Sequence, residues 1–174
     1  MRKVIVINGS GGAGKDTLIE FAKERYKCKN VSSIDPIKHA AEWLGWKRTK
    51  DLKSRKFLSD MKLLSTNYND FPMDYLKIKY EQFIHGYNQI MFVHIREPWE
   101  IKRFVEDVCP EAKTLLIRGR RETEVYGNTA DDGVENFVYD YVYKNELPLK
   151  DAKKDFLDFL YKIIDESQDV GGGI

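Results

Sequence analysis

The stretch Val4-Ile5-Val6-Ile7-Asn8-Gly9-Ser10-Gly11-Gly12-Ala13-Gly14-Lys15-Asp16-Thr17 decides the fold of this chain. Its first four residues are β-branched and apolar, and they run directly into a glycine-rich turn. A segment with the apolar spacing of a helix follows. This pattern predicts a buried strand, a loop and the N-terminus of a helix.

The glycine-rich turn has the spacing of a phosphate-binding loop, in which Gly-Lys follows a first glycine after four residues. Glycine adopts positive φ easily, so successive backbone N–H groups can curl around one phosphate. The helix N-terminus adds unpaired N–H groups and partial positive charge, and the Lys15 ammonium can reach the outer phosphates. We therefore expect the loop to bind the phosphates of ATP through Gly9, Gly11, Gly12, Ala13, Gly14, Lys15, Asp16 and Thr17.

The residue directly after the lysine is unusual for such a loop. A hydroxyl residue is usual there, but this chain has Asp16, and Thr17 comes one residue later. Mg²⁺ prefers hard oxygen ligands and keeps several of its waters. Asp16 or Thr17 is therefore expected to contact Mg²⁺, directly or through water.

Length, charge and cysteine content restrict the class of protein. The chain has 174 residues, enough for one domain with a real core, and a net charge of +1, which does not suggest a nucleic-acid partner. Cys28 and Cys109 have no pairing or metal-ligand spacing and are expected to be free thiols. The apolar run after Arg2-Lys3 is too short for a signal peptide, and no later run approaches a membrane span. We expect a soluble cytoplasmic protein with no membrane partner, either a monomer or a homodimer.

Apolar periodicity and turn residues divide the chain into alternating strands and helices. Strands are expected at about 4–7, 31–34, 90–95, 114–117 and 137–143, with helices at about 15–26, 36–44 and 98–108 and after Pro148. Asp35 is expected to cap the second helix and Gly45 to end it. Such alternation predicts a three-layer α/β/α fold with a five-stranded, mostly parallel sheet, whose ligands bind at the carboxyl ends of the strands.

Two segments depart from this alternation. Residues 47–86 are helical in period, with two helices separated by Phe71-Pro72, and resemble an insert that covers a substrate. The apolar side of the first of these helices is expected to comprise Leu52, Phe57, Leu58, Met61 and Leu64. Residues 118–133 form a charged loop with interior glycines, typical of a lid. We therefore predict a single domain, 1–174, with an insert at about 47–86 and a lid at about 118–133.

The form Gly14-Lys15-Asp16-Thr17 resembles the loop of the nucleoside monophosphate kinases, and most closely their deoxynucleoside monophosphate kinase branch. Ile34-Asp35-Pro36-Ile37-Lys38 is similar to the Ala-Asp-Pro-Leu-Lys segment of that branch, and 95–100 to its Asp-x-Arg-x-Pro-x-Glu stretch. Residues 140–147 resemble its Asp-x-x-Ile-x-Asn segment. The resemblance implies a P-loop NTPase fold of nucleotide kinase type. It also implies transfer of the γ-phosphoryl of ATP, with Mg²⁺, to a (deoxy)nucleoside 5′-monophosphate.

Candidate acceptor residues follow the second and third strands. Arg96 stands at a strand carboxyl end, where its planar guanidinium can hold a substrate phosphate. Asp35 and Lys38 can shape the same pocket, although helix capping explains Asp35 equally well. Glu100, four residues after Arg96, is also assigned to this pocket, and it can simply orient that arginine. Arg55 in the insert is a weaker phosphate candidate, because its basic surroundings are more often a solvated helix face.

The predicted lid begins with three arginines around Gly119. Phosphoryl transfer spreads negative charge over the moving group, which a guanidinium can stabilise once a lid closes. Arg118, Arg120 and Arg121 all qualify, and the sequence does not select among them. By resemblance, Arg118 and Asn145 are expected to contact the nucleotide, and Asn145 borders its base together with Pro148.

One departure from the family pattern keeps other functions open. His94 stands where the family has an Asp, and a neutral imidazole arranges Mg²⁺ waters poorly, so either Asp16 takes over or activity is weak. A related kinase, of the dephospho-coenzyme A or phosphomevalonate type, and a nucleotide-binding sensor that has lost transfer activity remain alternatives. His39 and His85 lack partners at metal spacing, and no Asn-Lys-x-Asp stretch indicates a guanine-specific switch protein.

Overall fold

The computed structural model describes residues 2–119 and 133–165. The elements are, in chain order, β1 (Lys3–Asn8), α1 (Lys15–Arg25), β2 (Cys28–Ser32), α2 (Asp35–Trp43), α3 (Leu52–Asn69), α4 (Phe71–Ile84), β3 (Ile90–His94), α5 (Pro98–Asp107), β4 (Lys113–Gly119), β5 (Tyr141–Asn145) and α7 (Leu149–Asp165). The candidate lid residues Arg120 and Arg121, and most of the predicted lid, lie outside the described residues.

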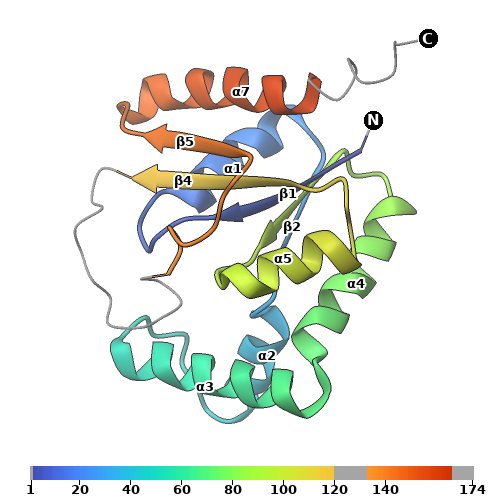
Figure 1. Cartoon of the computed structure of the whole chain (residues 1–174). Coiled ribbons are helices and arrows are strands. Elements are labelled where there is room, and N and C mark those ends of the chain that lie inside the picture. The colour runs from blue at the N-terminus through green and yellow to red at the C-terminus, as the bar shows by residue number, and fades with distance from the viewer. Residues whose placement is uncertain (1, 120–132, 166–174) are drawn as a thin grey trace.

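The five strands form one sheet in the order β2-β3-β1-β4-β5, and every neighbouring pair is parallel. Strand β1 lies at the centre, with Ile7 opposite His94 in β3 and Leu115 in β4. Figure 1 shows β1, β4 and β5 pointing toward the same edge of the sheet. The predicted three-layer α/β/α fold with a parallel five-stranded sheet is therefore confirmed.

Strict alternation along β1 divides the core into two clusters, one on each face of the sheet. Ile5 and Ile7 pack against the buried faces of α1 and α7, whereas Val4 and Val6 pack against those of α4 and α5. Helices α1 and α7 therefore cover one face of the sheet and α4 and α5 the other (Figure 1). The central strand is buried on both sides, as expected for a parallel sheet.

Strand β2 was expected at 31–34 but runs from Cys28 to Ser32, so this prediction is wrong in position. The strand lies at the edge of the sheet, and only Val31 among its residues is fully buried. An edge strand with one buried side chain has almost no continuous run of apolar residues. Because the apolar Ile34 follows the strand, the apolar pattern predicts a strand that starts and ends too late in the sequence.

The last strand is also displaced, since β5 runs from Tyr141 to Asn145 and not from 137 to 143. Asp140 Oδ2 accepts hydrogen bonds from the backbone N–H of Thr114 at 2.7 Å and from its hydroxyl at 2.9 Å. These bonds hold the chain just before it joins β4. Phe137 and Tyr139 pack edge-to-face outside the strand, with ring centroids 5.0 Å apart. The aromatic alternation therefore begins before the strand does.

Strand β4 is longer than the 114–117 expected, because it continues through Arg118 to Gly119. Arg118 and Gly119 are thus strand residues, where the start of the lid was expected. An added Cβ at Gly119 would lie 2.8 Å from the Cα of Ala13, so the end of β4 packs directly against the glycine loop.

The insert forms two helices as predicted, but the break between them is Asp70, at φ 56°, and Phe71-Pro72 opens the first turn of α4. Helix α4 buries apolar side chains in the core. The expected apolar side of α3 is correct only in part, because Phe57, Leu58 and Met61 are half-buried but Leu52 and Leu64 are 71% and 69% exposed. The buried residues of α3 are Ser54 and Lys62.

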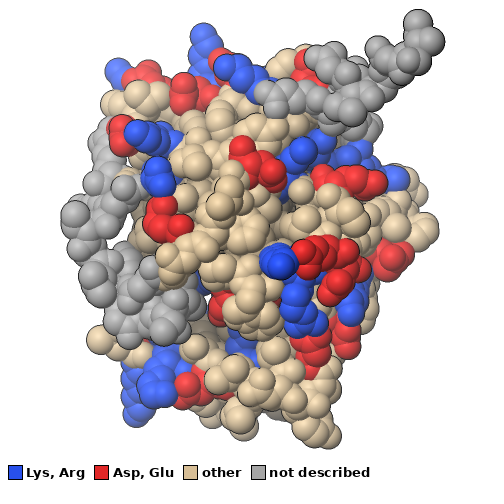
Figure 2. All heavy atoms as spheres, in the orientation of Figure 1, with Lys and Arg blue, Asp and Glu red and all other residues tan. Residues whose placement is uncertain are grey.

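The cysteines, the surface charges and the helix lengths of the described residues can be compared with the predicted class of protein. Cys28 and Cys109 are free thiols, as expected. Acidic and basic side chains are interspersed over the face seen in Figure 2. Among the described residues, no helix is long and apolar enough to span a bilayer.

Candidate active site

The glycine loop connects β1 to α1 in a conformation that requires glycine. Gly9, Gly12 and Gly14 have φ values of 149°, 81° and 89°, in the region that L side chains rarely adopt. A Cβ added at Gly9 would collide with the backbone carbonyl of Ile117 in β4. The loop is therefore shaped both by its own dihedral angles and by its close approach to the neighbouring strand.

Lys15 is the first residue of α1, and its side chain lies over the loop. Its Nζ donates hydrogen bonds to the backbone carbonyls of Gly9 at 2.5 Å and Ser10 at 3.0 Å. No side chain caps the N-terminus of α1, which begins after Gly14. An ammonium and the positive end of a helix dipole are thus directed at one point, the arrangement that binds an anion.

A cavity of about 570 Å³ opens beside the loop. Asn145, the last residue of β5, lies in its wall and donates from Nδ2 to the carbonyl of Ala13 at 3.0 Å. The same amide would collide with a Cβ at Gly14. The cavity brings together seven of the predicted site residues: Gly11, Gly12, Ala13, Gly14, Thr17, Arg55 and Asn145. Arg55 from the insert therefore lines the same cavity as the glycine loop.

Asn8 connects the loop to the turn after β3, a role that no sequence pattern predicts. Its Oδ1 accepts from the Gly9 N–H at 2.8 Å, and its Nδ2 donates to the Arg96 carbonyl at 3.0 Å. Nδ2 also donates to the Tyr139 hydroxyl at 2.8 Å, which in turn donates to the Val134 carbonyl. Asn8 is 1% exposed, and both the oxygen and the nitrogen of its buried amide form hydrogen bonds.

The carboxyl end of β3 carries a group of charged residues around His94. Burial is the largest cause that lowers the pKa of His94 to about 4, and the charge of Lys15 is the next. Lys38 and Arg96 act in the same direction, and Asp16 opposes them. Four predicted site residues from three elements thus lie close enough to interact electrostatically with one imidazole, which is neutral at pH 7.

The neutral imidazole is held by an amide from the edge strand. Its Nε2 lies 2.7 Å from Asn30 Oδ1, and because an amide oxygen can only accept, Nε2 carries the proton. His94 supplies no negative charge beside the glycine loop. Asp16 is the acidic residue whose charge acts on His94.

Two predicted acceptor residues have different partners from those expected. Asp35 lies in the first turn of α2, not at its N-cap, and its Oδ2 accepts from the Ser32 N–H at 2.8 Å. Glu100 binds Lys62 and the Ser33 hydroxyl, so the expectation that it orients Arg96 directly is wrong. Both carboxylates stabilise turns at the ends of strands.

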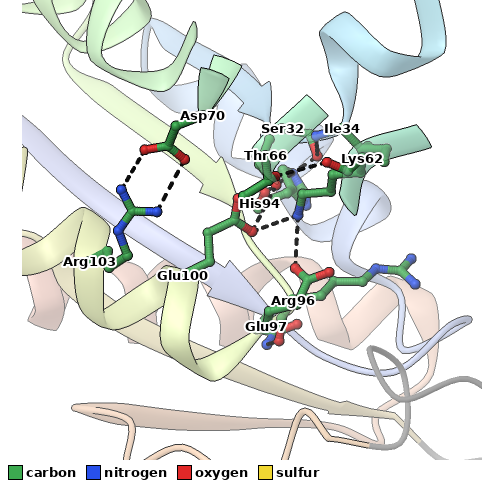
Figure 3. Close-up of polar contacts among 12 residues, drawn as sticks. Ser32, Ile34, Lys62, Thr66, Asp70, His94, Arg96, Glu97, Glu100 and Arg103 are labelled. Atoms are coloured by element: carbon green, nitrogen blue, oxygen red, sulfur yellow. Dashed lines mark hydrogen bonds and ion pairs between the residues drawn. The ribbon is translucent and has the colours of Figure 1, made fainter. Parts of the chain in front are cut away.

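Lys62 was missed because its partners lie far away in sequence. From the middle of α3 its Nζ lies 2.8 Å from Glu97 Oε2 and 2.6 Å from Glu100 Oε2 (Figure 3). The Lys62 and Glu100 side chains are 10% and 2% exposed. A lysine 35 residues before its nearest partner gives no periodic signal, and in the sequence it reads as part of a solvated helix face.

Arg96 follows β3 and Arg118 lies near the end of β4, so both arginines lie at the same edge of the sheet. Arg96 is exposed after β3, and Figure 3 shows its side chain extended away from Lys62. Arg118, near the end of β4, pairs with Glu135 through two hydrogen bonds of 3.1 and 2.6 Å. A guanidinium held by one carboxylate in this bidentate manner is fixed in orientation.

The candidate metal ligands face different sides of the loop. Thr17 lines the cavity, whereas Asp16 acts on His94 at the β3 side. No group of three or more His, Cys, Asp or Glu side chains suited to a metal occurs in residues 2–119 and 133–165. Thr17 and Asp16 offer a hydroxyl and a carboxylate, the hard oxygen donors that Mg²⁺ prefers.

No protein-family model matches the sequence, and no curated protein matches it. Among solved structures, an unliganded sugar kinase from Janibacter sp. HTCC2649 is similar, with a TM-score of 0.50, 12% identity and coverage of 92% of this chain and 95% of that one. Shikimate kinase from Aquifex aeolicus is also similar, with a TM-score of 0.50, 11% identity and coverage of 93% and 98%. At such low identity the likeness shows the fold alone: this chain has the three-layer α/β/α fold of the P-loop kinases.

Proposed function

We propose that this protein is a kinase that transfers the γ-phosphoryl of ATP to a (deoxy)nucleoside 5′-monophosphate. The observation that carries the proposal is the junction at Asn8, which joins the Lys15 loop to the turn that presents Arg96. A cationic donor site and a guanidinium for an acceptor phosphate thereby lie at the ends of adjacent strands. That two similar folds belong to a sugar kinase and a shikimate kinase supports the coarser proposal of a small-molecule phosphotransferase.

On the donor side, the glycine loop binds the ATP phosphates and Lys15 turns from the loop carbonyls toward them. Thr17 and Asn145 line the same cavity and contact the nucleotide. Leu147 and Leu149 give the cavity an apolar wall suited to a base near Pro148. Asp16 and Thr17 would hold Mg²⁺, whose positive charge would offset the negative charge of the phosphates during transfer.

On the acceptor side, Arg96 holds the phosphate of the monophosphate with its planar guanidinium. Lys38 adds positive charge from α2, and Arg55 reaches between acceptor and donor from α3. The insert at about 47–86 selects the acceptor. Arg118 at the end of β4, or Arg120 or Arg121 in the lid predicted to follow it, supplies a guanidinium to the transition state, with Arg118 exchanging Glu135 for the nucleotide.

A panel of nucleoside and deoxynucleoside monophosphates, assayed for ADP release with ATP and Mg²⁺, tests the proposal. At least one should be turned over, and the Lys15→Ala variant should lower kcat by about 10²-fold or more. Lys23→Ala, which removes an exposed lysine of the same helix, should leave turnover unchanged. Silence with every acceptor, or full activity without Lys15, contradicts the proposal. Product analysis with dephospho-coenzyme A and phosphomevalonate separates the related kinase types.

Arg96→Gln should separate acceptor binding from donor binding. Loss of a charge-assisted contact of about 1.5–3 kcal/mol should raise the KM for the monophosphate by roughly 10- to 100-fold. The KM for ATP should change little, since the glycine loop keeps its contacts. Lys102→Gln on α5, an exposed residue paired with Glu106, is the matched control. An unchanged acceptor KM in Arg96→Gln would assign the phosphate to another residue.

His94 favours a second candidate, a nucleotide-binding sensor with little transfer activity. Its pKa of about 4, caused first by burial, keeps it neutral where an acidic group would arrange Mg²⁺ waters. This candidate predicts tight ATP binding by the wild type without acceptor-dependent turnover. His94→Asp should then raise the rate by about tenfold or more, equivalent to 1.36 kcal/mol of transition-state stabilisation. Acceptor-dependent turnover in the wild type, with no gain in His94→Asp, excludes it.

A further inference from the structure

Three charged side chains, Lys62, Glu97 and Glu100, form a cluster between the insert and the start of α5 (Figure 3). One ammonium contacts both carboxylates at 2.8 and 2.6 Å. The Ser33 hydroxyl donates to the same Glu100 oxygen at 3.3 Å. The cluster therefore joins α3, α5 and the turn between β2 and α2 at one buried point.

Each element tied by the cluster carries a residue of the proposed acceptor site. Helix α3 presents Arg55 about two turns before Lys62. The turn before α5 presents Arg96, directly preceding a carboxylate of the cluster. Ser33 lies just before α2, which carries Lys38. The position of one lysine thus constrains three cationic side chains.

From these contacts we infer that Lys62 is a positioning residue for the acceptor. It holds the two carboxylates of α5 against α3 and so fixes the turn that presents Arg96 and the helix that carries Arg55. Lys62 itself touches no reacting atom. The inference rests on the proposed function, because it takes Arg96 as the residue that holds the acceptor phosphate.

The buried side chains of α3 indicate why a charged residue positions this helix. Ser54 and Lys62 are the buried residues of this helix, and the first belongs to its N-terminal cap with Asp51. In the middle of the helix Lys62 is the fully buried residue, and Phe57, Leu58 and Met61 near it are half-buried. Buried ion pairs add little net stability, because desolvation offsets the attraction, but their geometry is directional. Such a contact suits positioning better than adhesion.

The net charge of the Lys62, Glu97 and Glu100 cluster is zero below about pH 7. Burial raises the pKa of Glu100 to about 7, with Lys62 opposing this rise and Glu97 adding to it. Burial also acts to raise the pKa of Glu97, but the charge and hydrogen bond of Lys62 outweigh it and bring that pKa below its ordinary value. Another ion pair between α5 and the insert joins Arg103 to Asp70, and Glu100 acts on the pKa of Arg103. One ammonium, one carboxylate and one carboxylic acid thus share the site.

The Arg103–Asp70 pair provides a matched control. It also joins α5 to the insert, through hydrogen bonds of 3.1 and 2.5 Å (Figure 3). It lies about two turns of α5 beyond Arg96, however, and its side chains are 36% and 32% exposed. Both contacts therefore link α5 to the insert. Of the two, the Lys62 cluster is the one that lies next to Arg96 and its turn.

Lys62→Met and Arg103→Met test the inference side by side. Lys62→Met should lower kcat/KM for the monophosphate by about 10²-fold, mainly through KM, with the Kd for ATP unchanged. Arg103→Met should leave both constants within about twofold, and Lys62→Arg should recover most of the loss. Amide hydrogen exchange in the turn at 95–97 should accelerate in Lys62→Met alone, a readout independent of turnover. Equal effects of the two Met variants, or parallel losses for ATP and acceptor, overturn the inference. A wild type with no turnover speaks against the proposed function instead, and the exchange data still decide the role of Lys62.

Lys62→Met leaves Glu97 without its counter-ion and beside the ionisable Glu100, so the double variant Lys62→Met/Glu100→Gln makes the second side chain permanently neutral and keeps the test available. It should fold, retain ATP binding and still show the raised acceptor KM. A double variant with the wild-type acceptor KM counts against positioning by Lys62.

The pH dependence of stability tests the cluster without any substrate. Folded Glu100 keeps its proton to about pH 7, whereas the unfolded carboxyl loses it near 4.5. The folded state therefore binds more protons in between, and this contribution to the free energy of unfolding is lost as pH rises from about 4.5 to about 7. Glu100→Gln should remove that fall in denaturant titrations across this range, while Glu106→Gln, on the exposed side of α5, should keep it. Identical profiles for wild type and Glu100→Gln overturn the assigned cluster.

Discussion

The carboxamide of Asn8 is the contact on which the rest of the site depends. It satisfies the first amide of the glycine loop with its oxygen and the carbonyl of Arg96 with its nitrogen, both in the core. Buried polar groups left without partners cost about 1–3 kcal/mol each, so these bonds resist separate movement of their two ends. A single side chain thus completes the hydrogen bonding of both the glycine loop and the turn at Arg96.

The sheet order places that junction where it has most effect. Strand β1 is central, with β3 on one side and β4 on the other, so everything that follows these three strands meets at one edge. The close approach of Gly119 to Ala13, and of Gly9 to Ile117, leaves no room for side chains between β4 and the loop. Parallel pairing alone brings strand ends together. The glycines determine how closely the loop can pack there.

Sequence patterns were sufficient where one residue type answers one local physical demand. The glycine loop, α1 and the parallel core follow from positive φ and from uninterrupted β-branched runs. They were insufficient where tertiary contacts decide. Strand β2 is an edge strand with one buried residue, and the hydrogen bonds of Asp140 with Thr114 place the start of β5. Lys62 illustrates the limit most clearly, because a buried lysine is predictable only from partners that the chain brings from 35 and 38 residues away.

The two helices of the insert are attached to the core by different forces. Helix α4 buries Met73, Leu76 and Phe83, and apolar burial of about 1.5–3 kcal/mol per side chain holds it without strict geometry. Helix α3 instead buries Ser54 and Lys62 and leaves leucines exposed. Apolar packing tolerates small shifts, whereas a lysine between two carboxylates does not, since each displacement lengthens a charged hydrogen bond. Helix α4 is therefore held by apolar burial, whereas α3, which carries Arg55 to the cavity, combines half-buried apolar side chains with the directional contacts of Lys62.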